Sequence, residues 1–437
     1  MTKNAPPATE KINQIVQHCA KLGVSQIITE DTHLDGRAIR VENKEMINFG
    51  SCSYLGLEVD PRLKQKSKEA IDNFGTQYSC SRAFVAISPY EELEEKLSQL
   101  FGYPTVLAPT TTLGHLSNIP VLVGQNDAVI LDHKVHSSIQ NAVQIVKAKG
   151  THIEMIRHNR MDILEERIQK LQREYKKVWY MADGIYSMYG DFAPVKKIYD
   201  LLEKYEQFHF YVDDAHGMSW AGENGKGYVL SQIPYHERMI LILSLAKGFG
   251  SCGGALVFPD TKTRDLVKNC GSTLMFSGPL QPSLLGASIA SADIHLSSEI
   301  YQLQENLQSR IKYFIEISKA YDLTLVGDFR TPIFFFAVGA PEMGYKICRR
   351  MMDRGFYTNL AAYPSVPYYN TGIRITLNNN HSYADIRNCL SAFQEEFTAV
   401  MKEENYDKEK IYKAFRKNGF FHDKIAIPKL IKKSIAL

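Results

Sequence analysis

Residues 241–254 read Leu-Ile-Leu-Ser-Leu-Ala-Lys-Gly-Phe-Gly-Ser-Cys-Gly-Gly, an apolar run that ends in one lysine followed by glycines and other small residues. The apolar run predicts a buried strand, and the glycines let other groups approach the chain closely. A lysine at the mouth of such a strand loses part of its hydration, which favours the neutral, nucleophilic amine. Lys247 is therefore a candidate Schiff-base lysine, although a lysine in a loop is more often a solvated surface residue.

Apolar runs of strand length recur along the chain, and segments with helical periodicity lie between most of them. The runs cover residues 128–131, 153–156, 178–182, 208–212, 239–243 and 255–258. This alternation predicts an α/β fold with a mainly parallel central sheet and helices on both faces. In such sheets the chemistry collects beyond the carboxyl ends of the strands, so the residues that follow each run are the candidate site residues.

The chain divides into four predicted segments. Residues 1–50 contain an amphipathic arm that is too short to be a domain, and residues 51–290 form a large domain. A long helical stretch over residues 284–321 leads into a smaller C-terminal α+β domain, which spans residues 291–403. Residues 404–437 form a lysine-rich extension, to which the sequence assigns no function.

Two helix starts are predicted in the large domain. Asp60-Pro61 opens a helix, because proline suits the first helical turn. A second helix begins near Glu91, with Ser88 as its expected N-cap.

The composition excludes several classes of protein. The 437 residues carry a net charge of +3 and are 44% hydrophobic, which fits a globular enzyme and argues against nucleic acid as the main partner. No apolar run reaches the roughly 18 residues of a membrane span, and the N-terminus lacks the apolar segment of a secretory signal. The seven cysteines form neither a disulfide framework nor a CxxC pair. We therefore expect a reduced, cytoplasmic protein.

The run at 208–212 is followed by Asp213-Asp214-Ala-His216-Gly. A carboxylate at the end of a buried strand is costly unless it faces a cation or a bound ligand. Asp213 and His216 are suited to bind a heterocycle. Asp213 would contact a protonated ring nitrogen, and His216 would contact a neighbouring phenolate oxygen. The same pair is also compatible with a metal site or with a capped turn.

Polar residues follow two more of the predicted strands. His136 comes after the run at 128–131, where it is placed to stack on a flat ring or to transfer a proton, although His133 or His136 can equally serve as a helix cap. Asp183 and Ser187 come after the run at 178–182 as part of a polar turn.

A possible phosphate site precedes the run at 128–131. The segment Pro109-Thr-Thr-Thr-Leu-Gly leads into a helix, and N–H groups at a helix start bind anions, although the threonines can also be plain helix caps. Ser244, just before Lys247, supplies a second hydroxyl. A lysine, a carboxylate for a ring nitrogen, imidazoles and a phosphate site are together the set that pyridoxal 5'-phosphate (PLP) uses.

The sequence resembles the α-oxoamine synthase family of fold-type I PLP enzymes, from about residue 48 to residue 397. The most specific matches are Tyr211-Val-Asp-Asp-Ala-His-Gly with Gly222, Gly225 and Gly227, then Ser244-Leu-Ala-Lys-Gly-Phe-Gly, and Arg354-Gly-Phe with Tyr363-Pro-Ser-Val-Pro. By position, Lys247 resembles the lysine that bonds the cofactor, Asp213 the pyridinium partner and His216 the ring-oxygen partner. His136 resembles the ring-stacking histidine.

The resemblance also implies how phosphate and substrate are held. Ser244 and the backbone of Thr111-Thr112 match the phosphate site, to which a segment like Phe276-Ser277-Gly278 of a second subunit contributes. A homodimer with shared active sites is therefore expected. Ser187 and Arg374 match the residues that hold the substrate carboxylate.

Several positions depart from the family pattern. The family usually has Asn where this chain has Cys52, Glu where it has the cofactor-site residue Asp183, and Gly-Tyr or Gly-Phe at Thr111-Thr112. A histidine near one helix start is here Tyr90. Because Cys52 removes an amide from the substrate site, these departures bear on the substrate rather than on the cofactor.

The reaction implied by the resemblance is a decarboxylative condensation. A small amino acid would condense with an acyl thioester, carried by coenzyme A or by an acyl carrier protein, to give an α-amino ketone. Lys247 would act as cofactor anchor and base, and His136 would hydrogen-bond the acyl carbonyl. Two alternatives are a transamination or aldol-type reaction on the same fold, and a non-catalytic scaffold or heterodimer subunit.

Overall fold

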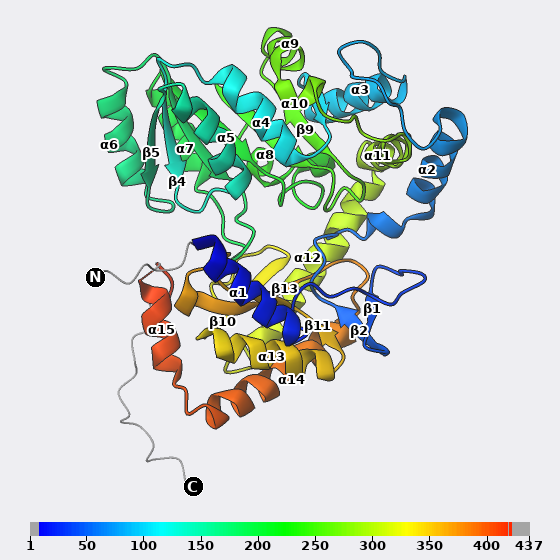
Figure 1. Cartoon of the computed structure of the whole chain (residues 1–437), viewed down its shortest axis with the longest axis vertical. Coiled ribbons are helices and arrows are strands. Elements are labelled where there is room, and N and C mark those ends of the chain that lie inside the picture. Colours follow the sequence, from blue (N-terminus) through cyan, green and yellow to red (C-terminus); the bar gives the residue numbers. More distant parts are fainter. Residues whose placement is uncertain (1–7, 418, 422–437) are drawn as a thin grey trace. The chain divides into compact units, whose positions relative to one another are not determined.

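The computed structural model describes residues 8–417 and 419–421 (Figure 1). These residues form two compact units. The large unit contains Ser51–Arg310 and Asn378–Asn380, and the small unit contains the described parts of Met1–Gly50, Ile311–Leu377 and His381–Leu437.

The large unit is built on a seven-stranded sheet with the order β3-β9-β8-β7-β6-β4-β5. Strands β4 to β8 are parallel to one another, and β9 is antiparallel to both of its neighbours. The strands are β3 (Thr105–Ala108), β4 (Ala128–Asp132), β5 (His152–Ile156), β6 (Val178–Asp183), β7 (Phe208–Asp213), β8 (Met239–Ser244) and β9 (Gly254–Val257). All six predicted runs are strands, so the predicted mainly parallel α/β sheet is confirmed.

Helices cover both faces of this sheet, as predicted, because its strand side chains alternate between two hydrophobic clusters. On β7, Phe210 belongs to one cluster, together with helices α3, α6, α7 and α11, and Tyr211 belongs to the other, together with α4, α5 and α9. The helices are α2 (Pro61–Phe74), α3 (Pro89–Phe101), α4 (Thr111–Leu122), α5 (Ser137–Ala148), α6 (Met161–Leu171), α7 (Val195–Lys204), α8 (Tyr228–Gln232), α9 (Thr261–Cys270), α10 (Ser272–Met275) and α11 (Pro282–His295), with short 3₁₀ turns η1 (Leu57–Val59) and η2 (Glu223–Gly225).

Both predicted helix starts are present. Asp60 caps α2, because its side chain accepts a hydrogen bond from the N–H of Arg62 at 2.8 Å. Ser88 stands at the N-cap position of the next helix, as predicted. Helix α3 already begins at Pro89, and Ser88 itself has helical angles (φ −53°, ψ −34°), so its hydroxyl makes no capping bond.

The long helical stretch predicted over residues 284–321 is two helices, α11 and α12 (Glu299–Ser318). Ser297 lies in the break between them. Its hydroxyl donates to the carbonyl of Ile294 at 2.8 Å and accepts from the N–H of Glu299 at 3.2 Å, which ends one helix and begins the next.

The small unit contains two three-stranded sheets, with the orders β1-β2-β11 and β10-β13-β12. Its strands are β1 (Ala38–Val41), β2 (Lys44–Asn48), β10 (Ile333–Gly339), β11 (Phe356–Tyr357), β12 (Asn359–Ala361) and β13 (Thr371–Thr376). Its other elements are α1 (Ala8–Lys21), α13 (Pro341–Asp353), the 3₁₀ turn η3 (Tyr368–Asn370), α14 (Tyr383–Glu403) and α15 (Lys408–Arg416).

The four-segment division of the chain stays a prediction, and residues 422–437 of the predicted extension lie outside the described residues. Among the described helices, none combines the length and the apolarity that a membrane crossing requires.

Candidate active site

The ends of the central strands bring several predicted site residues to one edge of the large unit. Asp183 ends β6 and Asp213 ends β7, and the two residues are direct partners in the parallel register. Ser244 ends the next strand, β8, and Lys247 follows three residues later. Residues that are far apart in the sequence therefore meet along one row of strand ends.

Asp213 is buried and held by a histidine that the sequence did not predict. Its Oδ2 lies 3.0 Å from Nε2 of His115, and its Oδ1 accepts from the N–H of Ala215 at 2.9 Å. Burial alone favours the neutral acid, but the hydrogen bond from His115 helps to lower the pKa of Asp213 to about 2. The positive charge of Lys247 acts in the same direction. Asp213 is therefore a carboxylate at neutral pH.

His115 lies on α4 and is itself completely buried. Its Nδ1 lies 2.8 Å from the hydroxyl of Tyr211 on β7, so a buried chain runs from Tyr211 through His115 to Asp213. The sequence did contain a signal for this residue. His115 stands four positions after Thr111, one helical turn from the predicted phosphate site and on the same face.

Asp183 has the opposite electrostatic environment from Asp213. Burial, followed by the charge of Asp213, raises the pKa of Asp183 well above its usual range, although its Oδ1 accepts from the backbone N–H of His136 at 3.0 Å. Two neighbouring carboxyl groups cannot both be charged at low cost in a buried site. The pair therefore carries one charge, on Asp213.

His136 caps helix α5 and still keeps one ring nitrogen available. Its Nδ1 accepts from the N–H of Ser138 at 3.3 Å and lies 2.6 Å from the Ser138 hydroxyl. Burial lowers the pKa of His136 below that of an ordinary histidine. The neutral ring then carries its proton on Nε2, so the capping role and a role in ligand binding are compatible.

His216 has a partner that the sequence analysis missed. Its Nδ1 lies 2.7 Å from the hydroxyl of Tyr54, and both side chains are buried. The backbone carbonyl of His216 accepts from the indole N–H of Trp220 at 2.6 Å. Tyr54 comes from a segment distant in sequence, so this contact could be found only from the folded chain.

Asp214 explains the glycines around the Asp-Asp-Ala-His-Gly motif. It is fully buried, and its Oδ2 accepts from the N–H of Val229 at 2.9 Å. A Cβ atom at Gly184, Gly217 or Gly227 would come within 2.5, 2.2 or 2.4 Å of an oxygen of this carboxyl. Only glycine fits at these three positions, and the packed carboxyl fixes the turn between Asp213 and His216.

The start of α4 is suited to hold an anion. Its N-cap is Thr110, whose hydroxyl accepts from the N–H of Leu113 at 3.1 Å, so the first helical residue is Thr111. The first N–H groups of a helix have no partner within the helix. A Cβ at Gly254 would lie 3.0 Å from the nitrogen of Thr111, and Gly254 pairs with Ser244 in the sheet. Glycine therefore lets this helix start approach the strand that carries Ser244.

A buried charged cluster joins the loops that carry these residues. His158 lies between two carboxylates, with Nδ1 2.9 Å from Asp132 Oδ1 and Nε2 2.6 Å from Asp191 Oδ2. Burial opposes the protonated form, but the bonds to both carboxylates raise the pKa of His158 above its ordinary value. Asp132 stands four residues before His136, and Asp191 stands four residues after Ser187.

The remaining predicted residues lie in different parts of the chain. Lys247, Cys52 and Ser187 are partly buried in the large unit, and the charge of Lys247 acts on Asp213 and on His136. Arg374 belongs to the small unit, where it is buried on β13. The large unit thus brings together the predicted cofactor residues, with Arg374 on a separate unit.

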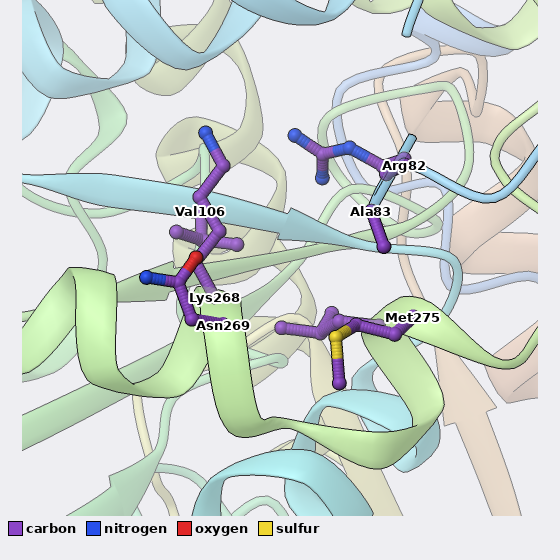
Figure 2. A pocket seen from close by; sticks show the side chains of 7 residues that line it. Arg82, Ala83, Val106, Lys268, Asn269 and Met275 are labelled. Carbon is purple, nitrogen blue, oxygen red and sulfur yellow. The ribbon is translucent and has the colours of Figure 1, made fainter. Parts of the chain in front are cut away.

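The segment around Ser277 lies next to a pocket of about 290 Å³. Figure 2 shows this pocket between the segment of Arg82 and the helix that ends at Met275. The hydroxyl of Ser277 donates to the carbonyl of Thr273 at 2.5 Å. Its neighbour Phe276 is 83% exposed, an unusual environment for an aromatic side chain.

Tyr90, which replaces the expected histidine, has a structural contact in this region. Its buried hydroxyl accepts a hydrogen bond from the N–H of Leu280, and the guanidinium of Arg82 stacks over its ring at 4.1 Å. Among the described residues, no group of three His, Cys, Asp or Glu side chains is arranged to hold a metal ion.

Known proteins resemble this chain over most of its length. The family model for aminotransferase class I and II matches residues 44–393. An 8-amino-7-oxononanoate synthase of Coprothermobacter proteolyticus is 32% identical over 373 residues, covering 84% of this chain and 91% of that protein. A serine palmitoyltransferase of Sphingobacterium spiritivorum is 29% identical, covering 80% of this chain and 86% of that protein.

The fold is also that of a solved enzyme. Serine palmitoyltransferase from S. paucimobilis, solved with a bound PLP–myriocin aldimine, superposes with a TM-score of 0.82 at 25% identity, covering 90% of this chain and 99% of that one. Together with the sheet and the strand-end residues described above, these matches mean that the chain belongs to the aminotransferase class I and II family and, within it, to the α-oxoamine synthases.

Proposed function

We propose that this chain is a PLP-dependent acyltransferase that condenses a small amino acid with an acyl thioester, with loss of CO2, to form an α-amino ketone. The observation that carries the proposal is the charge state at the strand ends. Asp213 is held as a buried carboxylate by His115, within reach of the charge of Lys247, while its neighbour Asp183 is driven toward the neutral form.

The residues present fit the cofactor. Asp213 is suited to keep a pyridine nitrogen protonated, and Ser244 with the start of α4 offers hydroxyl and N–H donors to a phosphate. Lys247 supplies an amine for the aldehyde, and His216 is held by Tyr54 for the ring oxygen. When bound, PLP supplies an aldehyde that bonds amines and a ring that accepts electrons from the substrate carbon.

Each protein group then has one task. Arg374 holds the substrate carboxylate with its guanidinium, and Lys247 removes the proton from the substrate Cα. The neutral ring of His136, with its proton on Nε2, donates a hydrogen bond to the thioester carbonyl as that oxygen gains negative charge. His115 keeps Asp213 charged, and therefore keeps the electron-accepting ring protonated throughout.

Turnover of amino acids with and without thioester tests this reaction. The PLP-loaded protein is incubated with glycine, alanine and serine, each with coenzyme A and carrier-protein thioesters, and CO2 release is followed. Condensation predicts CO2 release that depends on the thioester. Formation of a keto acid without any thioester would instead identify a transaminase.

We further propose a homodimer with shared active sites. Phe84 and Phe276 are 87% and 83% exposed, and the hydroxyl of Ser81 ties their two segments together by donating to the carbonyl of Met275 at 2.6 Å. Two exposed aromatic side chains beside a pocket are typical of a surface that another chain covers. A Phe84→Asp/Phe276→Asp double variant should be a monomer in light scattering, and a variant that stays dimeric would contradict this interface.

The cytoplasm is the compartment that we propose. None of the seven cysteines forms a disulfide, which suits a reducing environment. The amino acid substrate stays open, because Cys52 replaces an amide that the resemblance places at the substrate carboxylate.

A further inference from the structure

The small unit contains a basic pocket with a volume of about 460 Å³, which is within the usual range for small-molecule sites. It lies where α15 packs against η3 and the loop before it. Its principal side chains are those of Tyr368, Tyr369, Tyr406, Lys410, Lys413 and Lys417.

Three lysines line the pocket. Lys410, Lys413 and Lys417 have the spacing i, i+3, i+7 and are exposed. Within residues 8–417 and 419–421, none of the three lies within ion-pair distance of a carboxylate. Two other cations on this helix are paired, Lys408 with Asp322 at 2.6 Å and Arg416 with Glu409 at 3.0 Å. The positive charge that remains uncompensated is therefore the charge around the pocket.

The tyrosines give the pocket aromatic walls. The rings of Tyr368 and Tyr369 lie 5.1 Å apart and nearly perpendicular, and Tyr369 is 62% exposed. Lys410 lies over the ring of Tyr406 at 5.2 Å. Gly339, with a φ of +88°, makes room for this ring, since a Cβ there would come within 2.8 Å of the Tyr406 hydroxyl. One acidic side chain lies nearby, since the pKa of both Tyr368 and Tyr406 is raised by burial and also by the negative charge of Glu342.

The pocket is joined directly to a predicted substrate residue. Asn370, at its edge, is the last residue of η3, and strand β13 begins at Thr371 and carries Arg374. Four extended residues span about 13 Å. A ligand that fills the pocket would therefore lie only four residues along the chain from Arg374, in the same unit.

We propose that this pocket binds the adenine nucleotide of a coenzyme A thioester, with lysines 410, 413 and 417 on its phosphates and the tyrosine rings against its base. Lysine ammonium groups bind phosphates as point charges, and aromatic rings stack on bases of any kind. This inference rests on the proposed function, since it names the carrier of the acyl group. The alternative is that an acyl carrier protein donates the acyl group, and the test must distinguish this case from donation by coenzyme A.

Calorimetric titration of the PLP-loaded protein with free coenzyme A tests the proposal. The Lys410→Gln/Lys413→Gln variant should bind about tenfold more weakly for each lysine removed. The Lys319→Gln/Lys402→Gln variant loses the same charge from exposed positions elsewhere in the small unit, and its Kd should stay within about twofold of the wild-type value. A Tyr369→Leu variant should bind about tenfold more weakly through loss of stacking.

Equal affinity of the wild type and the Lys410→Gln/Lys413→Gln variant would overturn the proposal. Binding of an acyl carrier protein, but not of coenzyme A, would overturn it too. In steady-state assays the lysine variant should raise KM for acyl-coenzyme A and leave KM for acyl-pantetheine, which lacks the nucleotide, unchanged. Release of CO2 by the wild type without any thioester would contradict the proposed function. Thioester-dependent turnover with the same KM for acyl-coenzyme A in the wild type and the lysine variant would contradict only the proposed nucleotide pocket.

Discussion

At the scale of single residues, the central contact is the hydrogen bond between His115 and Asp213. The sequence located the carboxylate because it follows a strand, whereas the histidine acts from the side of a helix and only its spacing from Thr111 pointed to it. His216 shows the same limit, since its partner Tyr54 comes from a distant loop. Residues at strand ends can be predicted from pattern, whereas their partners depend on how helices and loops pack against those ends.

Replacing His115 should weaken the binding of PLP. In a His115→Phe variant the carboxyl of Asp213 loses its charged hydrogen bond, so its pKa rises from about 2 and less of it is charged in mildly acidic solution. A lost hydrogen bond to a charged group costs about 1.5–3 kcal/mol, or roughly tenfold or more in affinity for PLP. Fluorescence titration with PLP at pH values from about 5 to about 8 gives the Kd for PLP on both sides of neutrality and so measures this loss.

A matched variant separates this effect from simple packing. Tyr211→Phe removes only the hydroxyl behind His115 and leaves the bond to Asp213 in place, so its affinity for PLP should change less. Equal losses in the two variants, or a His115→Phe affinity that does not depend on pH, would mean that His115 does not act through the charge of Asp213.

The glycines around Asp214 lead to a stability prediction. Gly217→Ala would force a Cβ to within 2.2 Å of the Asp214 carboxyl and 2.6 Å of the Tyr228 nitrogen, and overpacking of this kind costs about 1–3 kcal/mol. Urea unfolding should therefore show a lower midpoint. Gly124→Ala is the control, because its Cβ would meet Asp127 at an ordinary 3.6 Å. Similar midpoints for the two variants would show that the packing around Asp214 can relax.

At the scale of elements, the sequence predicted six of the seven strands of the central sheet and missed β3. Parallel strands covered on both faces are nearly continuous apolar runs, so β4, β6, β7 and β8 stand out in the sequence. Strand β3 has four residues, begins with Thr105 and directly follows Pro104, so its apolar part is only Val106-Leu-Ala and does not stand out by pattern. The Ser-Pro pair at residues 88–89 predicted the N-cap position, but it could not show that Ser88 has helical angles and makes no side-chain capping bond.

The cluster of His158 joins three such loops and should make their stability depend on pH. Because the folded pKa of His158 is raised, its contribution to the free energy of unfolding is fully present below the ordinary histidine value of about 6.5 and is lost as the pH rises through the folded pKa. Asp132 has a lowered pKa, so its contribution is lost only as the pH falls through that lower value.

Urea unfolding at several pH values measures this dependence. The stability difference between the wild type and His158→Gln should be largest in mildly acidic solution and should shrink as the pH rises. His133→Gln, an exposed substitution in the loop after β4, is the control and should show no such trend. A difference for His158→Gln that stays constant with pH would mean that the charge of His158 does not tie these loops together.

At the scale of the whole molecule, the chain distributes its predicted site over two units. The large unit carries the candidate cofactor residues on the ends of one sheet, and the small unit carries Arg374 and the basic pocket beside it. The family resemblance was visible in the sequence because its motifs are local in the chain. The pocket was not, since its tyrosines and lysines are brought together only when α15 packs against η3.

The proposed role of Lys247 as the cofactor anchor can be tested by locating the lysine that bonds PLP. The purified protein is loaded with PLP, reduced with borohydride, digested and analysed by mass spectrometry, alongside a Lys247→Ala variant. We expect the mass of the reduced cofactor on the peptide that contains Lys247. The Lys247→Ala variant should lack this adduct, the visible absorbance band and thioester-dependent CO2 release. An adduct on a different lysine, or a band that survives in Lys247→Ala, would show that Lys247 does not anchor the cofactor.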